Sequence, residues 1–239
     1  MKKTILLTFA FALFLIQVHA QEVRIPEIGA EAPSFTAEST NGVIHFPADY
    51  GRHWKILFAH PKDFTPVCSS ELLELGYQQE SFADLNTELV VVSTDLLEQH
   101  RSWVAALEEV RYDGRAPVDI RFPLVADHSM KIARAYGMIH SASSPSQNIR
   151  GVYFIDPDNT IRSIQFYPNE VGRNVDELKR TLLALQETYA QDNIVTPANW
   201  QPGDDVMVPF LTAEEKSSLG SSDSEFYQPT WFLTFKKLN

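Results

Sequence analysis

Cysteine is almost absent from the 239-residue sequence, because Cys68 is the only one. A single cysteine excludes an intramolecular disulfide and the Cys-x-x-Cys motif of disulfide oxidoreductases. Histidine clusters with the spacing of metal sites are lacking too, and pairs such as His53 with His60 and His128 with His140 do not have that spacing. We therefore expect no metal ion and no organic cofactor, and a thiol that is either reactive or linked to another chain.

Basic residues are scarce as well. The sequence has 20 Lys and Arg against 31 Asp and Glu, a formal net charge of −11. A balance this acidic provides no surface that attracts nucleic acid or an anionic membrane. We predict no nucleic-acid partner and no stable membrane association.

Long apolar runs are lacking except near the N-terminus, where Ile5–Ile16 is almost entirely apolar. Lys2 and Lys3 precede this run, and Val18-His19-Ala20 follows it. The pattern is typical of a signal peptide cleaved after Ala20, and the run is short of the roughly 20 residues that span a bilayer. No cysteine lies near the cleavage site, so lipidation there is excluded. We predict a signal peptide over residues 1–20 and export to the periplasm or the medium, and a permanent membrane anchor is the alternative.

The surroundings of Cys68 predict an unusual thiol. A short apolar strand, Trp54–Phe58, comes first, and Thr65 followed by Pro66 is a typical helix start. The residues after Cys68 recur at helical spacing and would lie on one face of a helix: Leu72, Leu75, Gln79 and Phe82. Cys68 therefore lies in the first turn, where free backbone N–H groups and the helix dipole favour the thiolate. Pro61 and Pro66 fix the loop. The alternative is an inert cysteine in the core.

Strands and helices alternate along the rest of the chain. A hairpin with Asn41-Gly42 at its centre is expected over Ser34–Phe46, and turn residues 156–159 join two further strands. The expected strands are Lys55–Phe58, Glu88–Thr94, Asp119–Ala126, Gly151–Asp156 and Thr160–Phe166. The expected helices are one capped by Asp95 with Leu96, Val104 and Leu107 as apolar positions, Ser129–Tyr136, and Asn174–Gln191. This order predicts an α/β sandwich around a central sheet.

The composition changes near Ile194. Residues 196–209 are rich in loop formers, Ser217–Ser224 is polar, and Trp231–Phe235 has strand character. Such a tail is too small to form a core alone. It is expected to pack on the main domain or on a second subunit.

The motif Pro61-x-x-x-Thr65-x-x-Cys68, within the longer string His60–Glu71, resembles the active site of peroxiredoxins of the AhpC/TSA type. Asp63–Cys68 is similar to the one-cysteine, peroxiredoxin 6-like subgroup. The resemblance implies a thioredoxin-like fold, a central mixed sheet flanked by helices, over residues 24–193. It also implies a C-terminal extension over 194–239 that contributes to dimer contacts. The implied activity is the reduction of hydrogen peroxide and organic hydroperoxides by a homodimer or a larger homo-oligomer.

The candidate catalytic residues follow from the chemistry and from this resemblance. Cys68 is the predicted nucleophile, and Thr65 lies three residues earlier, so its hydroxyl is expected to reach the sulfur or the peroxide. Thr65 is also expected to cap the helix. Charge on the departing oxygen requires a permanent cation, and Arg150 matches the arginine that peroxiredoxins place beside the cysteine. Pro61 belongs to the motif.

Three supporting residues are predicted. Glu71 lies on the same side of the helix as Cys68 and is expected to orient Arg150. Arg173 matches a second arginine of the one-cysteine subgroup, with a plain surface residue as the alternative. His60 is expected either to hydrogen-bond near the sulfur or to hold the loop.

Two departures from the family pattern carry consequences. No resolving cysteine exists, so a sulfenic acid on Cys68 must be reduced by an external thiol. Some members of the subgroup also carry a lipase serine where this chain has His53, which makes lipase activity doubtful. The alternatives to a peroxidase are a redox sensor or holdase, and a thiol hydrolase.

Overall fold

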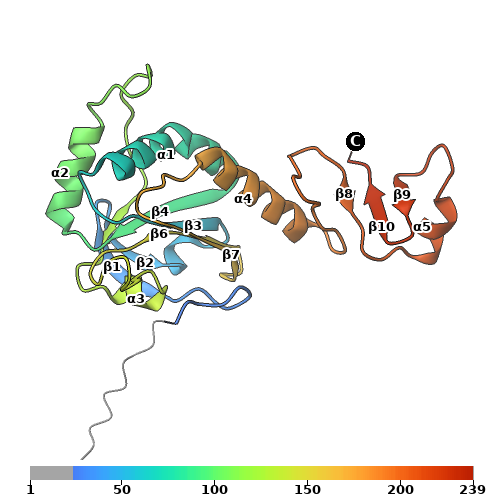
Figure 1. Ribbon diagram of the computed structural model, residues 1–239, viewed down its shortest axis with the longest axis horizontal. Coiled ribbons are helices and arrows are strands. Elements are labelled where there is room, and N and C mark those ends of the chain that lie inside the picture. Colours follow the sequence, from blue (N-terminus) through green and yellow to red (C-terminus); the bar gives the residue numbers. More distant parts are fainter. Residues whose placement is uncertain (1–23, 239) are drawn as a thin grey trace, which may run out of the picture.

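The computed structural model describes residues 24–238. The predicted signal peptide, residues 1–20, lies outside the described residues and stays a prediction. A body built around one sheet holds most of the described chain, and a smaller C-terminal part extends from it (Figure 1). Within residues 24–238, no helix has the length and apolar character needed to cross a membrane.

The body contains a mixed sheet in the order β2-β1-β5-β4-β3-β6-β7. Its strands are β1 (Phe35–Ser39), β2 (Gly42–Phe46), β3 (Trp54–Ala59), β4 (Thr87–Ser93), β5 (Leu124–Ala126), β6 (Arg150–Ile155) and β7 (Ile161–Tyr167). The central strands β3, β4 and β5 are parallel, and the outer pairings are antiparallel. The predicted thioredoxin-like fold is confirmed.

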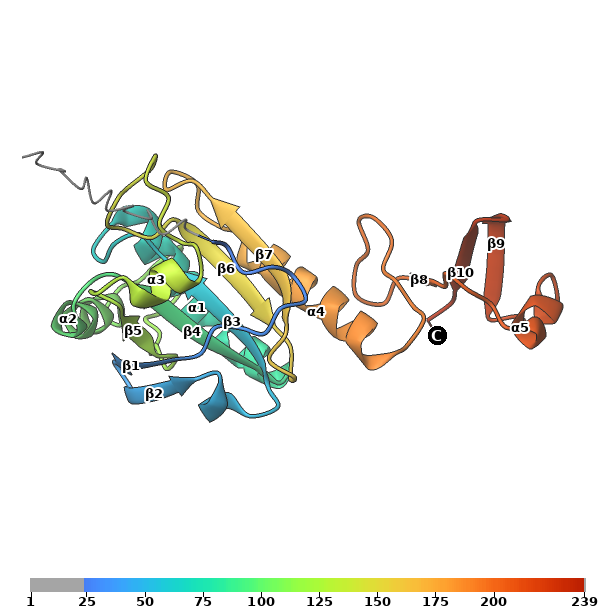
Figure 2. The ribbon, with the colours of Figure 1, turned by 90° about the horizontal axis from the view of Figure 1, so that it is seen from below.

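Helices cover both faces of this sheet (Figure 2). They are α1 (Pro66–Asp84), α2 (Leu97–Leu107), α3 (Lys131–Ala135) and α4 (Val175–Ala190), with a 3-10 turn at Ala48–Tyr50. Strand β3 is buried along its whole length because alternate residues enter two cores. Ile56 and Phe58 join a cluster with α1, α2 and α4, whereas Leu57 and Ala59 join the cluster that includes α3.

Most predicted elements are confirmed, and two are corrected. Asp95 does not cap α2, which begins after Leu96, because its carboxylate accepts hydrogen bonds from the Asp63 N–H and the Ser93 hydroxyl instead. Of the strand expected over residues 119–126, only β5 forms. The backbone at residues 119–121 is bound by side chains of Gln79 and Glu108, so it has no need of a neighbouring strand.

The tail after α4 forms a small unit of its own. It contains β8 (Val206–Met207), α5 (Ala213–Ser218), β9 (Phe226–Thr230) and β10 (Leu233–Lys236), with the antiparallel order β8-β10-β9. Ser217 and Ser218, the first two residues of the polar segment 217–224, are the last two residues of α5. The tail does not fold back over the sheet but stands beyond the end of α4 (Figures 1 and 2). The predicted boundary between residues 193 and 194 stays a prediction.

Candidate active site

Cys68 is the third residue of α1 and is fully buried. Pro66 begins the helix and Thr65 is its N-cap, as predicted. The Thr65 hydroxyl, however, forms no capping bond. It donates to the carbonyl of Lys62 at 2.8 Å and so closes the loop before the helix, rather than contacting the sulfur. Pro61, also in this loop, is buried.

Arg150 lies beside the sulfur. Arg150 is the first residue of β6, which pairs antiparallel with β3 so that Val152 faces Phe58. This register brings Arg150 next to the end of β3, where the loop to Cys68 begins. Its Nη1 is 3.3 Å from Cys68 Sγ and 2.7 Å from a carboxylate oxygen of Glu71. Its Nε and Nη2 donate to the carbonyl of Asn169. The guanidinium is therefore held on two sides while one edge faces the thiol.

Glu71 joins both predicted arginines. One turn after Cys68, it accepts from Arg150 and, at 2.7 to 2.9 Å, from the Nε, Nη2 and backbone N–H of Arg173. Arg173 also donates to the carbonyls of Ala59 and Gly151, and its guanidinium lies 3.2 Å above the centre of the Phe58 ring. Arg173 is thus a buried part of the site and not a surface residue. Two cations face one carboxylate, which leaves one net positive charge beside the sulfur.

This charge arrangement shifts the pKa values of its members. Burial alone would raise the pKa of Glu71, but the hydrogen bonds and charge of Arg173 outweigh it, so the pKa lies below its ordinary value. Burial lowers the pKa of Arg173, which its bonds to Glu71 oppose. Glu71 is ionised at neutral pH and holds both guanidinium groups in place.

His60 holds the loop and does not hydrogen-bond to the sulfur. Its Nε2 lies 2.8 Å from one oxygen of Asp63, and Nδ1 of His100 lies 2.7 Å from the other. Sequence reasoning missed Asp63 and His100 as members of the site. The usable signal was Asp63 within the motif, and the i, i+3 spacing of His100 and Trp103 on one face of α2.

Ligand atoms of His60, Asp63 and Asp95 lie within 4.8 Å of one another, a grouping that sequence spacing did not predict. The hydrogen bonds of Asp63 to His60 and of Asp95 to the Asp63 N–H account for this closeness. The arrangement is that of a hydrogen-bonded network.

His53 lies at the surface, with its Nδ1 3.0 Å from a carboxylate oxygen of Glu88. His53 and Glu88 form an exposed imidazole–carboxylate pair. Neither group is a hydroxyl nucleophile.

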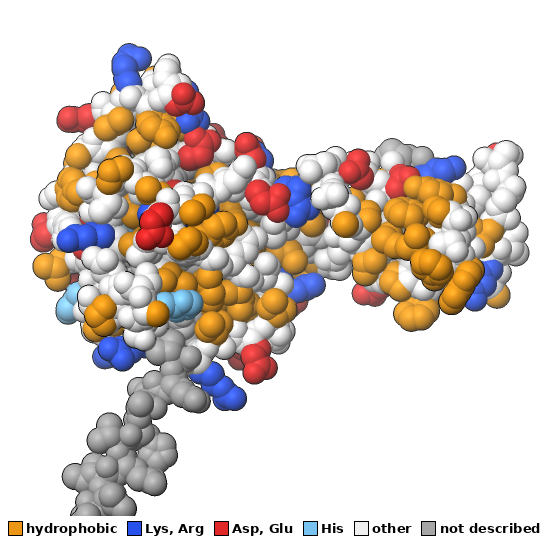
Figure 3. All heavy atoms as spheres, viewed as in Figure 1, with side chains coloured by type: hydrophobic (Ala, Val, Ile, Leu, Met, Phe, Trp, Pro, Cys, Tyr) orange, Lys and Arg blue, Asp and Glu red, His pale blue; other side chains and the backbone are white. Residues whose placement is uncertain are grey.

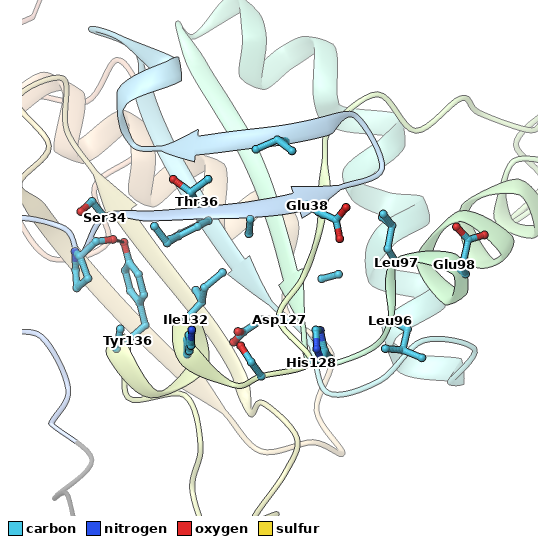
Figure 4. Close-up of a pocket in the computed structure, with 18 of the residues that line it drawn as sticks. Ser34, Thr36, Glu38, Leu96, Leu97, Glu98, Asp127, His128, Ile132 and Tyr136 are labelled. Atoms are coloured by element: carbon cyan, nitrogen blue, oxygen red, sulfur yellow. Dashed lines mark hydrogen bonds between the residues drawn. The ribbon is translucent and has the colours of Figure 1, made fainter.

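A cavity of about 990 Å³ lies away from Cys68, between β1, the start of α2 and α3. Figure 4 shows Thr36 and Glu38 of β1 across from Asp127 and Ile132. Beside the cavity, β1 pairs with β5 at a single residue pair, Ser39 with Val125. None of its described lining residues belongs to the loop or helix that carries Cys68.

Comparison with known proteins agrees with this geometry. The profile of the AhpC/TSA family matches residues 28–164, more than half of the chain. The chain belongs to this family. A second profile, the C-terminal domain of 1-Cys peroxiredoxin, matches residues 184–217. A peroxiredoxin of Methanosarcina mazei is 43% identical over 89% of this chain and 98% of its own length. The protein is accordingly a peroxiredoxin, an oxidoreductase with thiol peroxidase activity.

Solved peroxiredoxin structures resemble it along most of the chain. A yeast mitochondrial 1-Cys peroxiredoxin superposes with a TM-score of 0.78 and 32% identity, covering 90% of this chain and 100% of that one. A cysteine-to-serine mutant of peroxiredoxin 6 from Arenicola marina gives 0.78 and 31%, with coverages of 90% and 99%. The single cysteine of this chain fits the one-cysteine type.

Proposed function

We propose that this peroxiredoxin reduces hydrogen peroxide and organic hydroperoxides through a sulfenic acid on Cys68. The thiolate sulfur attacks one peroxide oxygen, an S–O bond forms, and the O–O bond breaks. The electron pair leaves on the second oxygen, which takes up a proton as water or an alcohol. The sulfur, oxidised by two electrons, becomes the sulfenic acid.

The observation that supports this proposal most strongly is the contact of Arg150 Nη1 with Cys68 Sγ at 3.3 Å. The guanidinium favours negative charge on the sulfur before the reaction. Because its remaining donors are fixed by Glu71 and Asn169, the same group is preorganised for charge that develops on the peroxide oxygens. Thr65 lies in the adjacent loop, and because its one hydroxyl proton is donated to the Lys62 carbonyl, its proposed contact with the bound peroxide is through the hydroxyl oxygen as an acceptor.

An external thiol completes the proposed cycle. A first thiol condenses with the sulfenic acid to give a mixed disulfide and water, and a second thiol releases the Cys68 thiol and a disulfide of the reductant. The absence of a second cysteine from the sequence supports this route. The structure of the yeast relative concerns a thiol-resolving mechanism through glutathione and thioredoxin systems.

A homodimer or larger homo-oligomer is the proposed assembly. The tail exposes large apolar side chains, with Phe210 78% exposed, Trp231 85% and Phe232 64%. Figure 3 shows hydrophobic side chains gathered on the tail. Apolar groups this exposed are usually covered by a partner. We further propose export after cleavage near Ala20, supported by the N-terminal pattern of the sequence, and hence antioxidant defence outside the cytoplasm.

Turnover of hydrogen peroxide and cumene hydroperoxide with excess dithiothreitol or glutathione tests the proposal. We expect many turnovers for the wild type, none for Cys68→Ser, and unchanged turnover for Ser70→Ala as a matched control on the same helix turn. Oxidation that stops after one equivalent with both reductants, together with a change of size on gel filtration, would instead support a redox sensor.

A further inference from the structure

The Asp63 carboxylate lies between two histidines that come from different elements. His60 follows β3 directly, and His100 lies on α2. Their nitrogens are 2.8 and 2.7 Å from the two oxygens of Asp63, and all three side chains are 0% exposed. Because water does not reach these groups, the protons within the cluster must satisfy its hydrogen bonds.

Hydrogen-bond geometry assigns a proton to each nitrogen of His100. Nε2 lies 3.2 Å from the carbonyl oxygen of Val125, which can only accept, so Nε2 carries a proton. Nδ1 faces Asp63. Burial alone would raise the pKa of Asp63, but the hydrogen bonds from His100 and His60 hold it below its ordinary value. Asp63 is therefore a carboxylate that only accepts, and Nδ1 also carries a proton.

His60 is left in one neutral tautomer. Its Nε2 carries the proton that Asp63 accepts, and burial lowers its pKa, which disfavours a second proton. Its Nδ1 is buried and has no hydrogen-bond partner among the described residues. The charged groups that face this cluster are Asp63 itself and Asp95, whose carboxylate binds the Asp63 N–H.

Helix α2 also contacts the cysteine helix next to Cys68. Trp103, one turn after His100, donates from Nε1 to the Ser69 hydroxyl at 3.3 Å. Its ring centre is 5.1 Å from that of His60 and 6.3 Å from that of Phe64, a loop residue with a positive φ of 57°. The loop from His60 to Thr65 is thus held against α2 by His100, which contacts Asp63, and by Trp103, which packs near His60 and Phe64.

We propose that His100 is a positioning residue of the peroxide site, an imidazolium that fixes Asp63 and thereby holds His60 and the loop before Cys68 in their reactive geometry. The proposal rests on the proposed peroxidase function. It adds a residue outside the cysteine motif, which acts through Asp63 and touches neither sulfur nor peroxide.

Two substitutions of His100 and one control at the neighbouring position test the hydrogen bonds and the charge that His100 supplies. His100→Leu removes both donors. His100→Asn keeps a neutral donor near the place of Nδ1, and Arg101→Leu, on the exposed side of α2, is the matched control. We expect His100→Leu to slow oxidation of Cys68 by hydrogen peroxide about tenfold or more, since small displacements of reacting groups are costly. His100→Asn should slow the oxidation less than His100→Leu, because one donor to Asp63 remains although the positive charge is lost. Arg101→Leu should equal the wild type.

The second readout is ¹⁵N NMR of the imidazole nitrogens at pH 7, which reports the protonation state of each nitrogen. A purely structural role of His100 would not change the tautomer of His60. In the wild type we expect two protonated nitrogens on His100 and a bare Nδ1 on His60, and in His100→Leu a mixture of His60 tautomers. A neutral His100 in the wild type would overturn the proposal even if His100→Leu fails to fold. A folded His100→Leu that oxidises at the wild-type rate would also overturn it. A wild-type protein that does not reduce peroxide would instead refute the proposed peroxidase function.

Discussion

At the scale of single residues, Glu71 organises the site. Among residues 24–238 it is the one carboxylate that contacts both Arg150 and Arg173, and both guanidinium groups are almost fully buried. A buried cation is stable only when paired, so removing Glu71 leaves two charges without compensation. Arg150 can keep its planar fork near the sulfur because Glu71 and the Asn169 carbonyl bind the rest of it.

Arg150→Lys is expected to slow Cys68 oxidation by about 100- to 1,000-fold, in the range typical of a lost oxyanion donor. A lysine keeps the positive charge but lacks the fork that reaches Sγ, Glu71 and Asn169 together. Stopped-flow fluorescence with hydrogen peroxide measures the rate, and Arg134→Lys, exposed on α3, is the control. Equal rates for the two variants would remove Arg150 from the mechanism.

The stability of the protein is expected to depend on Glu71 in acid. Its pKa is lowered in the folded state, so its contribution to the free energy of unfolding is present above the unfolded value of about 4.3 and is lost as the pH falls through the folded value. Urea unfolding between pH 7 and pH 3 measures this. Glu71→Gln should be less stable at pH 7 and lose less stability on acidification. Parallel curves for the two proteins would contradict the predicted pairing.

At the scale of elements, the pattern of apolar residues predicted the strands and helices that depend on local sequence. The apolar runs gave β3 and β4, and the spacing of Val175, Leu178 and Leu182 gave α4, whose N-cap Asn174 accepts from the Glu177 N–H. The edges of elements were less predictable. Asp95 looks like a helix cap, but a tertiary contact with the Asp63 N–H takes its carboxylate. β5 is shorter than expected because side chains from distant helices bind the preceding backbone.

Leu182→Ala tests the packing of α4 on the sheet. Leu182 is fully buried, whereas Leu185 on the same face is only partly buried. We expect Leu182→Ala to lower the free energy of unfolding by about 2–5 kcal/mol, as for other buried leucines, and Leu185→Ala to lower it less. Denaturant unfolding measures both. An equal effect of the two substitutions would contradict the packing of α4 described above.

At the scale of the whole molecule, the site depends on contacts between segments far apart in the chain. Cys68 could be predicted from its helix start alone, but Arg150 and Arg173 were predicted only through the family resemblance. No local pattern indicates that residues 71, 150 and 173 meet. The Asp63–His100 pair was missed for the same reason, since it joins a loop to a helix across 37 positions of sequence.

The tail is expected to mediate self-association. Trp231 and Phe232 lie at the turn between β9 and β10 and are the most exposed aromatic residues of the tail together with Phe210. Replacing both with Ser should shift the protein toward monomer at micromolar concentration in sedimentation velocity. Val43→Ser, an exposed apolar position on β2, should leave the oligomer unchanged. A double variant that sediments like the wild type would exclude this surface.

The most direct test of the proposed chemistry is the intact mass of the protein after one equivalent of hydrogen peroxide in the presence of dimedone. We expect a single dimedone adduct within seconds, mapped to Cys68 by peptide analysis, and none in Cys68→Ser. A thiol that remains unmodified after minutes would mean that Cys68 is an inert core residue and that the Arg150 contact does not activate it.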